Sequence, residues 1–190
     1  VADETISLED EHEDVQNSIE RIQGALNWLN KQVLHRARTV WPDQWKSLNP
    51  APISIASWVG YDLDGRTDIG WQQMIGLRLE EKAVQLERYL GKTRELNSEA
   101  LSPLVDALES ALKSTRIHVK KFDGEVEQPD VLADAANALT ASEQSGHVTS
   151  VKSFVEIIDA IIEQLASGDD ELVINLILLR SEMNNLGLGT

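Results

Sequence analysis

The chain has 190 residues, of which 42% are hydrophobic and 26% charged, a balance typical of one domain with a buried core. Its formal net charge of −15 would repel phosphate backbones, so we expect no nucleic-acid partner. It contains no cysteine, no apolar run long enough for a membrane span and no signal-peptide pattern, which excludes disulfides and thiolate metal sites and favours a cytoplasmic protein without a membrane partner.

The first predicted element is a long helix from about residue 8 to about residue 40. Acidic residues at 9–14 and basic residues at Arg36 and Arg38 lie at the ends where they complement the helix dipole, and Pro42 ends the helix. Apolar residues alternate at spacings of four and three, which predicts one buried stripe. This stripe consists of Val15, Ile19, Ile22, Leu26, Leu29 and Val33.

The helical pattern is absent from about residue 41 to residue 67. Three prolines interrupt this region, and Ile53 and Ile55 alternate with small residues, so we predict one short strand over residues 53–56 followed by an irregular loop. The five tryptophans all lie within the first 71 residues. We expect Trp28, Trp41, Trp45 and Trp71 in core or interface packing.

Five further helices are predicted after the loop. The first starts near Ile69 and is ended by Gly91 and Asn97, and the next starts at Ser98, with Ile117 and Val119 compatible with helix or extended chain. Short or strongly amphipathic patterns then predict helices over about residues 130–140, 151–165 and 170–186. The expected fold is mainly α, with residues 1–190 as one helical domain in which adjacent helices pack antiparallel.

The loop "SIASWVGYDLDGRTDIGW" carries three aspartates within seven residues. Asp64 immediately precedes Gly65 and Leu63 lies between the first two acids, but no suitably placed glutamate follows, so a calcium loop is not expected. A tight turn in which aspartates accept local hydrogen bonds and Gly65 adopts a positive φ is the simpler interpretation.

This loop resembles a known motif. "SWVGYDLDGRTD", preceded by "PAPISIA", is similar to F-G-S-W-M-G-G-D-R-D-G-N-P of the phosphoenolpyruvate carboxylases. The upstream "VLHRARTVWPDQW" and the closing "LRSEMNNLGLGT" also resemble that family, so the similarity covers about residues 33–94 and, weakly, the last dozen. The matching positions are Ser57, Trp58, Gly60, Asp62, Asp64 and Gly65.

The resemblance implies a piece excised from a mainly helical fold built around an eight-stranded barrel. It implies a lyase of carbon fixation and the tricarboxylic acid cycle, which adds bicarbonate to phosphoenolpyruvate with Mg²⁺ or Mn²⁺ and yields oxaloacetate and phosphate. Trp58 would then form an apolar wall of the substrate site, while Asp62 and Asp64 would orient backbone and cations or only make the turn. The implied wall residues are Trp58, Gly60, Asp62, Asp64, Gly65 and Arg66.

The chain departs from the family at several positions. Leu63 replaces the arginine between the two aspartates, Tyr61 replaces a glycine, and Arg66 offers a substitute cation three residues along. The family's catalytic histidine motif and glycine–arginine loops do not occur, and the four histidines lack ligand spacing. We therefore expect no catalysis and no metal in the isolated chain, whose partner would be the remainder of a parent chain.

Two other interpretations remain open. The chain is alternatively a stand-alone, non-catalytic interaction or regulatory module descended from that family, which forms a homo-oligomer through a helical stripe such as that of residues 151–165. The third interpretation is a generic helical bundle whose loop resembles the family by chance.

Overall fold

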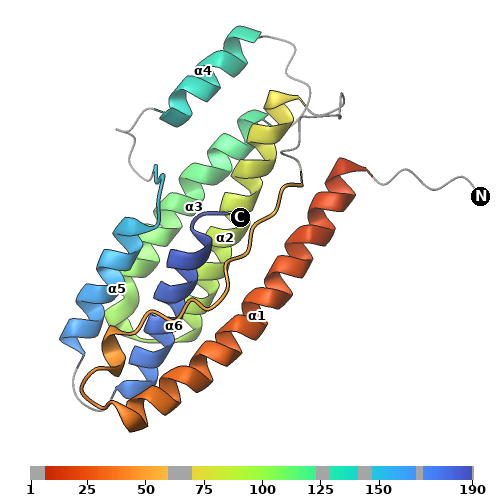
Figure 1. Cartoon of the computed structure of the whole chain (residues 1–190). Helices are drawn as coiled ribbons and strands as arrows, with labels where there is room; N and C mark the ends of the chain where they lie inside the picture. The colour runs from red at the N-terminus through yellow and green to blue at the C-terminus, as the bar shows by residue number, and fades with distance from the viewer. Residues whose placement is uncertain (1–6, 60–69, 123–128, 141–146, 166–168, 190) are drawn as a thin grey trace, which may run out of the picture.

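The computed structural model describes residues 7–59, 70–122, 129–140, 147–165 and 169–189. Over these residues the chain is mainly helical, as predicted, and forms no strand (Figure 1). None of the helices found there is both long and apolar enough to cross a membrane. The α-helices are α1 (Leu8–Val40), α2 (Trp71–Glu95), α3 (Ser102–Phe122), α4 (Pro129–Thr140), α5 (Lys152–Gln164) and α6 (Asp170–Leu186), with short 3-10 turns η1 (Trp45–Ser47) and η2 (Glu99–Leu101).

The limits of α1 are those that the sequence predicts. Ser7 caps the helix, because its side chain accepts a hydrogen bond from the backbone N–H of Asp10, at 3.1 Å. At the other end the N–H of Trp41 still donates to the carbonyl of Ala37, and Pro42 cannot continue the ladder. Local capping and proline chemistry therefore set the length of α1.

The predictions for the next two helices need two corrections. Gly91 does not end α2, which continues to Glu95, and only Asn97 leaves the helical region, with a φ of 45°. Ile117 and Val119 lie inside α3, so the extended alternative is wrong. The pairing of α2 with α3 is the most extensive between any two described elements, and it outweighs the weak helix propensities of a glycine and β-branched residues.

The core lies between α2, α3, α5 and α6, with α6 at its centre. Because α6 is apolar on nearly every side, it must be surrounded by other elements to be stable. In Figure 1, α6 runs between α1, α2 and α5. Its buried apolar residues are Val173, Ile174, Leu176, Ile177, Leu178, Leu179, Met183 and Leu186.

The amphipathic stripe of α5 faces this core. Phe154 and Ile158 are almost fully buried, and Ile161 and Ile162 are buried beside them. The stripe is therefore covered within one copy of the chain. The expectation that residues 151–165 offer a surface for self-association is wrong.

Helix α1 lies at the edge of the bundle and presents an unexpected face to it (Figure 1). Its C-terminal half packs on α6 through Leu34 and Ala37, which belong to the core. Of the predicted stripe only Ile19 is buried, whereas Ile22 and Leu29 are exposed. The buried face is thus rotated by about a quarter of a turn from the predicted one, at roughly 100° per residue.

The short strand predicted over residues 53–56 is not formed. Residues 51–58 have neither helical nor strand hydrogen bonding. They belong to a segment, residues 46–59, that we name the crossing segment, because it crosses α6 on its way towards the start of α2 (Figure 1). No barrel sheet is present in the described ranges, and the place of this chain in a barrel fold stays a proposal.

Candidate functional site

Side chains from two helices hold the crossing segment in place. On α6, Arg180 Nη2 donates to the carbonyl of Leu48 at 2.7 Å, and Asn185 Nδ2 donates to the carbonyl of Ile53 at 2.7 Å. On α1, Asn30 Nδ2 donates to the carbonyl of Pro50 at 3.1 Å. The segment is therefore fixed by its carbonyl groups, at intervals, rather than by a neighbouring strand.

The composition of the segment explains this mode of attachment. Pro50 and Pro52 have no backbone N–H and disfavour helix for the residues before them. Carbonyl groups that point towards α1 and α6 still require donors, and the asparagine and arginine side chains supply them. The opposite side of the segment remains open, since Ile53 is exposed.

The crossing segment ends at the beginning of the tryptophan–glycine–aspartate loop. The N–H of Val59 donates to Ser57 Oγ at 3.2 Å, and Val59 is buried against Leu8 and Leu77 at the starts of α1 and α2. Trp58, which lies between Ser57 and Val59 in the sequence, is 77% exposed. The chain is thus anchored on one side of Trp58 while the indole itself faces solvent.

Of the six predicted wall residues, the structure describes only Trp58. Gly60, Asp62, Asp64, Gly65 and Arg66 lie outside the described residues, so whether they gather around Trp58 stays a prediction.

The other tryptophans follow their prediction only in part. Trp45 in η1 is buried in the core beside α1 and α6, as expected. Trp28, Trp41 and Trp71 are exposed, so core packing is wrong for these three and interface packing is not tested.

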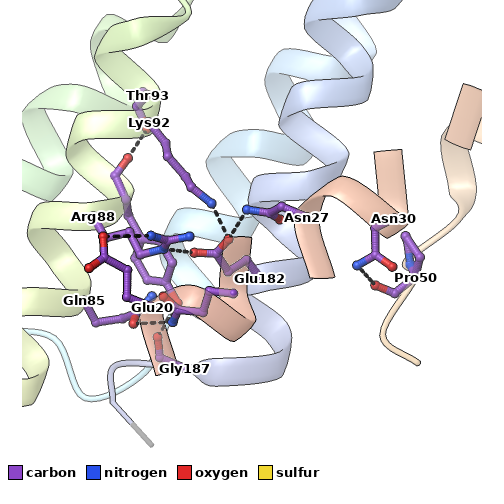
Figure 2. A network of polar contacts seen from close by, with 12 residues as sticks. Glu20, Asn27, Asn30, Pro50, Gln85, Arg88, Lys92, Thr93, Glu182 and Gly187 are labelled. Carbon is purple, nitrogen blue, oxygen red and sulfur yellow. Dashed lines mark hydrogen bonds and ion pairs between the residues drawn. The ribbon is translucent and has the colours of Figure 1, made fainter. Parts of the chain in front are cut away.

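A buried ionic network joins α1, α2 and α6, and nothing in the sequence pattern indicates it. The carboxylate of Glu182, only 4% exposed, accepts hydrogen bonds from Arg88 Nε at 2.7 Å and Asn27 Nδ2 at 2.6 Å, and it also accepts from Lys92 Nζ. Figure 2 shows the three donors converging on this one carboxylate. Arg88 also approaches Glu20 of α1, at 3.7 Å.

The electrostatics of this network indicate a structural role. Burial lowers the pKa of Lys92, and the negative charge of Glu182 acts in the opposite direction. Burial and the same charge raise the pKa of Tyr89, whose hydroxyl donates to the carbonyl of Gly187 at 2.7 Å. Because three donors already occupy the carboxylate of Glu182, it fastens the helices and is not available to a ligand.

A second polar bridge connects the N-terminal halves of α1 and α2. The buried Glu81 lies 3.2 Å from His12 Nε2 and accepts from Gln16 Nε2 at 3.2 Å, and Gln23 donates to Gln85 at 2.9 Å. A groove of about 620 Å³ runs between the two helices along these contacts. Along this groove long polar side chains hold α1 to α2, in addition to the apolar cluster of Leu8, Val59 and Leu77 at the starts of the two helices.

The metal expected for the parent enzyme stays a prediction. No group of three histidine, aspartate or glutamate side chains there could hold a metal ion. We therefore assign no role of Mg²⁺ or Mn²⁺ to these residues.

Comparisons with family models, with curated proteins and with solved structures found no match to the chain. The proposal of a function consequently depends on the residues of the loop and on the segment that leads into it.

Proposed function

We propose that the chain is a helical part of a cytoplasmic phosphoenolpyruvate carboxylase-like enzyme, which carries a loop at the edge of the substrate site and is not catalytic alone. The observation that carries the proposal is the crossing segment. It is extended, it leads directly into the Ser57–Gly65 resemblance, and its fixed carbonyls hold it against the bundle.

An extended segment with an open side suits a strand whose neighbours come from elsewhere. Unpaired backbone groups on such a segment form a template for another strand. The remainder of a parent chain would supply those strands, and the helices would act as the rigid support. In that position the exposed Trp58 would border the substrate site as an apolar wall and limit the access of water.

The chemistry must then come from outside this chain. Carboxylation of phosphoenolpyruvate needs cations for the anionic substrates and for the developing enolate, and a divalent metal supplies part of that charge. Leu63 stands where the family has an arginine, so the loop itself contributes less charge than the family pattern. The parent would compensate through Arg66 or through cations elsewhere.

The test is an assay of the native gene product for oxaloacetate formation from phosphoenolpyruvate and bicarbonate, with Mg²⁺ or Mn²⁺. We expect activity in the native protein and none in the 190-residue chain. Trp58→Ala should lower kcat/KM by about tenfold or more, the effect of losing one well-placed contact, while Trp71→Ala, which removes another exposed indole, should leave it unchanged. A native product without the upstream histidine and the downstream glycine–arginine loops would contradict the proposal.

One observation favours the alternative of a stand-alone interaction module. The outward face of α1 exposes several large apolar residues, as a protein-binding helix does. An inactive native product no longer than this chain would support that function over the first.

A further inference from the structure

Helix α1 turns several polar residues inwards, beside apolar ones such as Leu34 and Ala37, and leaves other apolar residues outside. His12, Gln23 and Asn30 are buried, whereas Ile22, Leu29, Val33 and Val40 are 42, 41, 45 and 45% exposed. Leu26 is half-buried between them. We name Ile22, Leu26, Leu29, Val33 and Val40 the outer stripe.

The outer stripe follows the repeat of a helix that packs on another helix. Successive members are separated by four, three, four and seven residues, which places them on one face. A set of exposed apolar residues aligned in this way marks an interaction site rather than ordinary surface.

The stripe is symmetric about its own centre. Leu26 and Leu29 lie at equal distances on either side of the midpoint between residues 27 and 28, and so do Ile22 and Val33. The half-buried Val15 and the exposed Val40 extend the same symmetry. An antiparallel copy of α1 would therefore place an apolar residue opposite each of these positions.

The charges of α1 favour the same direction. Residues 8–20 include six acidic residues and no lysine or arginine, whereas residues 31–40 include Lys31, Arg36 and Arg38 and no acidic residue. Lys31 and Arg38 lie against Glu171 and Asp170 of α6, at 2.6 and 3.6 Å, so the acidic half of α1 carries most of this argument. Antiparallel pairing brings opposite charges together, and parallel pairing brings like charges together.

We propose that the outer stripe of α1 binds α1 of a second copy of this chain, antiparallel, about a two-fold axis that passes between residues 27 and 28. The interface is isologous, so Ile22 of each copy faces Val33 of the other. A self-symmetric stripe suits a copy of itself better than an unrelated helix.

This inference does not rest on the proposed enzyme function. It concerns the outward face of α1 and holds for the chain with or without catalysis. Its test measures dimer formation, which does not depend on oxaloacetate formation.

Cysteine cross-linking tests the register directly, because the chain contains no cysteine. Ile22→Cys and Val33→Cys proteins are prepared separately and oxidised, alone and as a mixture. In the antiparallel dimer, two copies of position 22 lie about 16 Å apart along the axis, at about 1.5 Å per residue, which is too far for a disulfide. We expect a disulfide-linked dimer only in the mixture, between one copy of each variant.

Oligomeric state gives the second measurement. Light scattering should show a mass rising with concentration towards twice 21.1 kDa. Leu29→Glu should abolish dimerisation, while the control Ile117→Glu, at an exposed position on α3, should retain it. Circular dichroism, and thermal unfolding at a dilution where both variants are monomers, should be alike for both, which separates loss of association from loss of folding.

Three results would overturn the proposal. The first is a monomer at every concentration. The second is efficient cross-linking of Ile22→Cys with itself, which indicates parallel pairing. The third is a dimer that survives Leu29→Glu, which places the interface elsewhere.

Discussion

Helix α6 buries mainly apolar side chains, whereas α1 buries several polar side chains beside apolar ones such as Leu34 and Ala37. α6 is surrounded by the bundle and fills the core with apolar side chains on almost every side. α1 has a clear apolar periodicity, yet it is bound to α2 by glutamine, histidine and arginine contacts and presents much of its apolar stripe to solvent. Periodicity thus identifies the residues that require cover without identifying which neighbour provides it.

Shortening one isoleucine in each helix should give the largest difference in stability between α6 and α1. Ile174→Ala on α6 removes a fully buried side chain and should lower the free energy of unfolding by about 2–5 kcal/mol. The same change at the exposed Ile22 on α1, measured in dilute solution, should cost about 0.5 kcal/mol or less. Urea unfolding of both variants checks this difference, and equal losses would show that α1 is as deeply packed as α6.

The ionic network should give the next largest effect. Glu182→Gln removes the counter-charge of Arg88 and Lys92 in a buried position and should cost about 3 kcal/mol, near the lower end for a broken buried pair. Glu156→Gln is the matched control, because Glu156 pairs with Lys152 only at the surface, at 3.8 Å, and should change stability by about 0.5 kcal/mol at most. If both variants unfold at the same urea concentration, the network does not fasten α1 and α2 to α6.

Removing one hydrogen bond that holds the crossing segment should have a smaller effect on stability, confined to that segment. Asn185→Ala removes the hydrogen bond to the carbonyl of Ile53 and should cost about 1 kcal/mol. Limited proteolysis within residues 51–59 should accelerate, while amide hydrogen exchange in α5 remains unchanged. Asn184→Ala, which removes only a weak contact with Asn49 at 3.5 Å, serves as the control. Unaltered proteolysis in Asn185→Ala would show that the segment is held by other contacts.

The smallest effect expected is a pH dependence from His118. This buried side chain of α3 lies edge-on to His147, at 5.9 Å between ring centroids. Burial, then the charges of Lys121, His147 and Lys82, lower its pKa. The unfolded chain, with the ordinary histidine pKa of about 6.5, therefore binds the proton more readily than the folded chain.

The sign of the effect follows from that difference. Stability should rise as the pH increases from the lowered pKa of His118 towards about 6.5, and the penalty should be complete below the lowered pKa. His118→Gln should flatten the rise in a series of urea unfolding curves between acidic and neutral pH. Identical slopes in the two proteins would contradict the assignment to His118.

Local signals account for what the sequence predicted well. Ser7, Pro42 and the regular apolar spacing specify α1 closely, and similar signals locate the other helices within a few residues. The strand failed because residues 53–56 have no partner strand in the described chain, and a strand exists only as a member of a sheet.

Tertiary relations account for what the sequence could not predict. Glu182 accepts a hydrogen bond from Asn27, which lies 155 positions away in the sequence. The residues around each of them contain no pattern that predicts this contact. The inner face of α1 could not be predicted either, because polar residues such as Gln23 and Asn30 are not expected to be buried before their partners are known. Of the candidate site, the exposure of Trp58 is established, and the arrangement of the residues from Gly60 to Arg66 stays a prediction.

The contrast between α1 and α6 can be tested most directly by amide hydrogen exchange at several protein concentrations. If a second copy covers the outer stripe, protection of residues 22–33 should increase with concentration, while protection of residues 173–183 in α6 should stay constant. Protection of α1 that is independent of concentration would show that no second copy covers this face and would contradict the account.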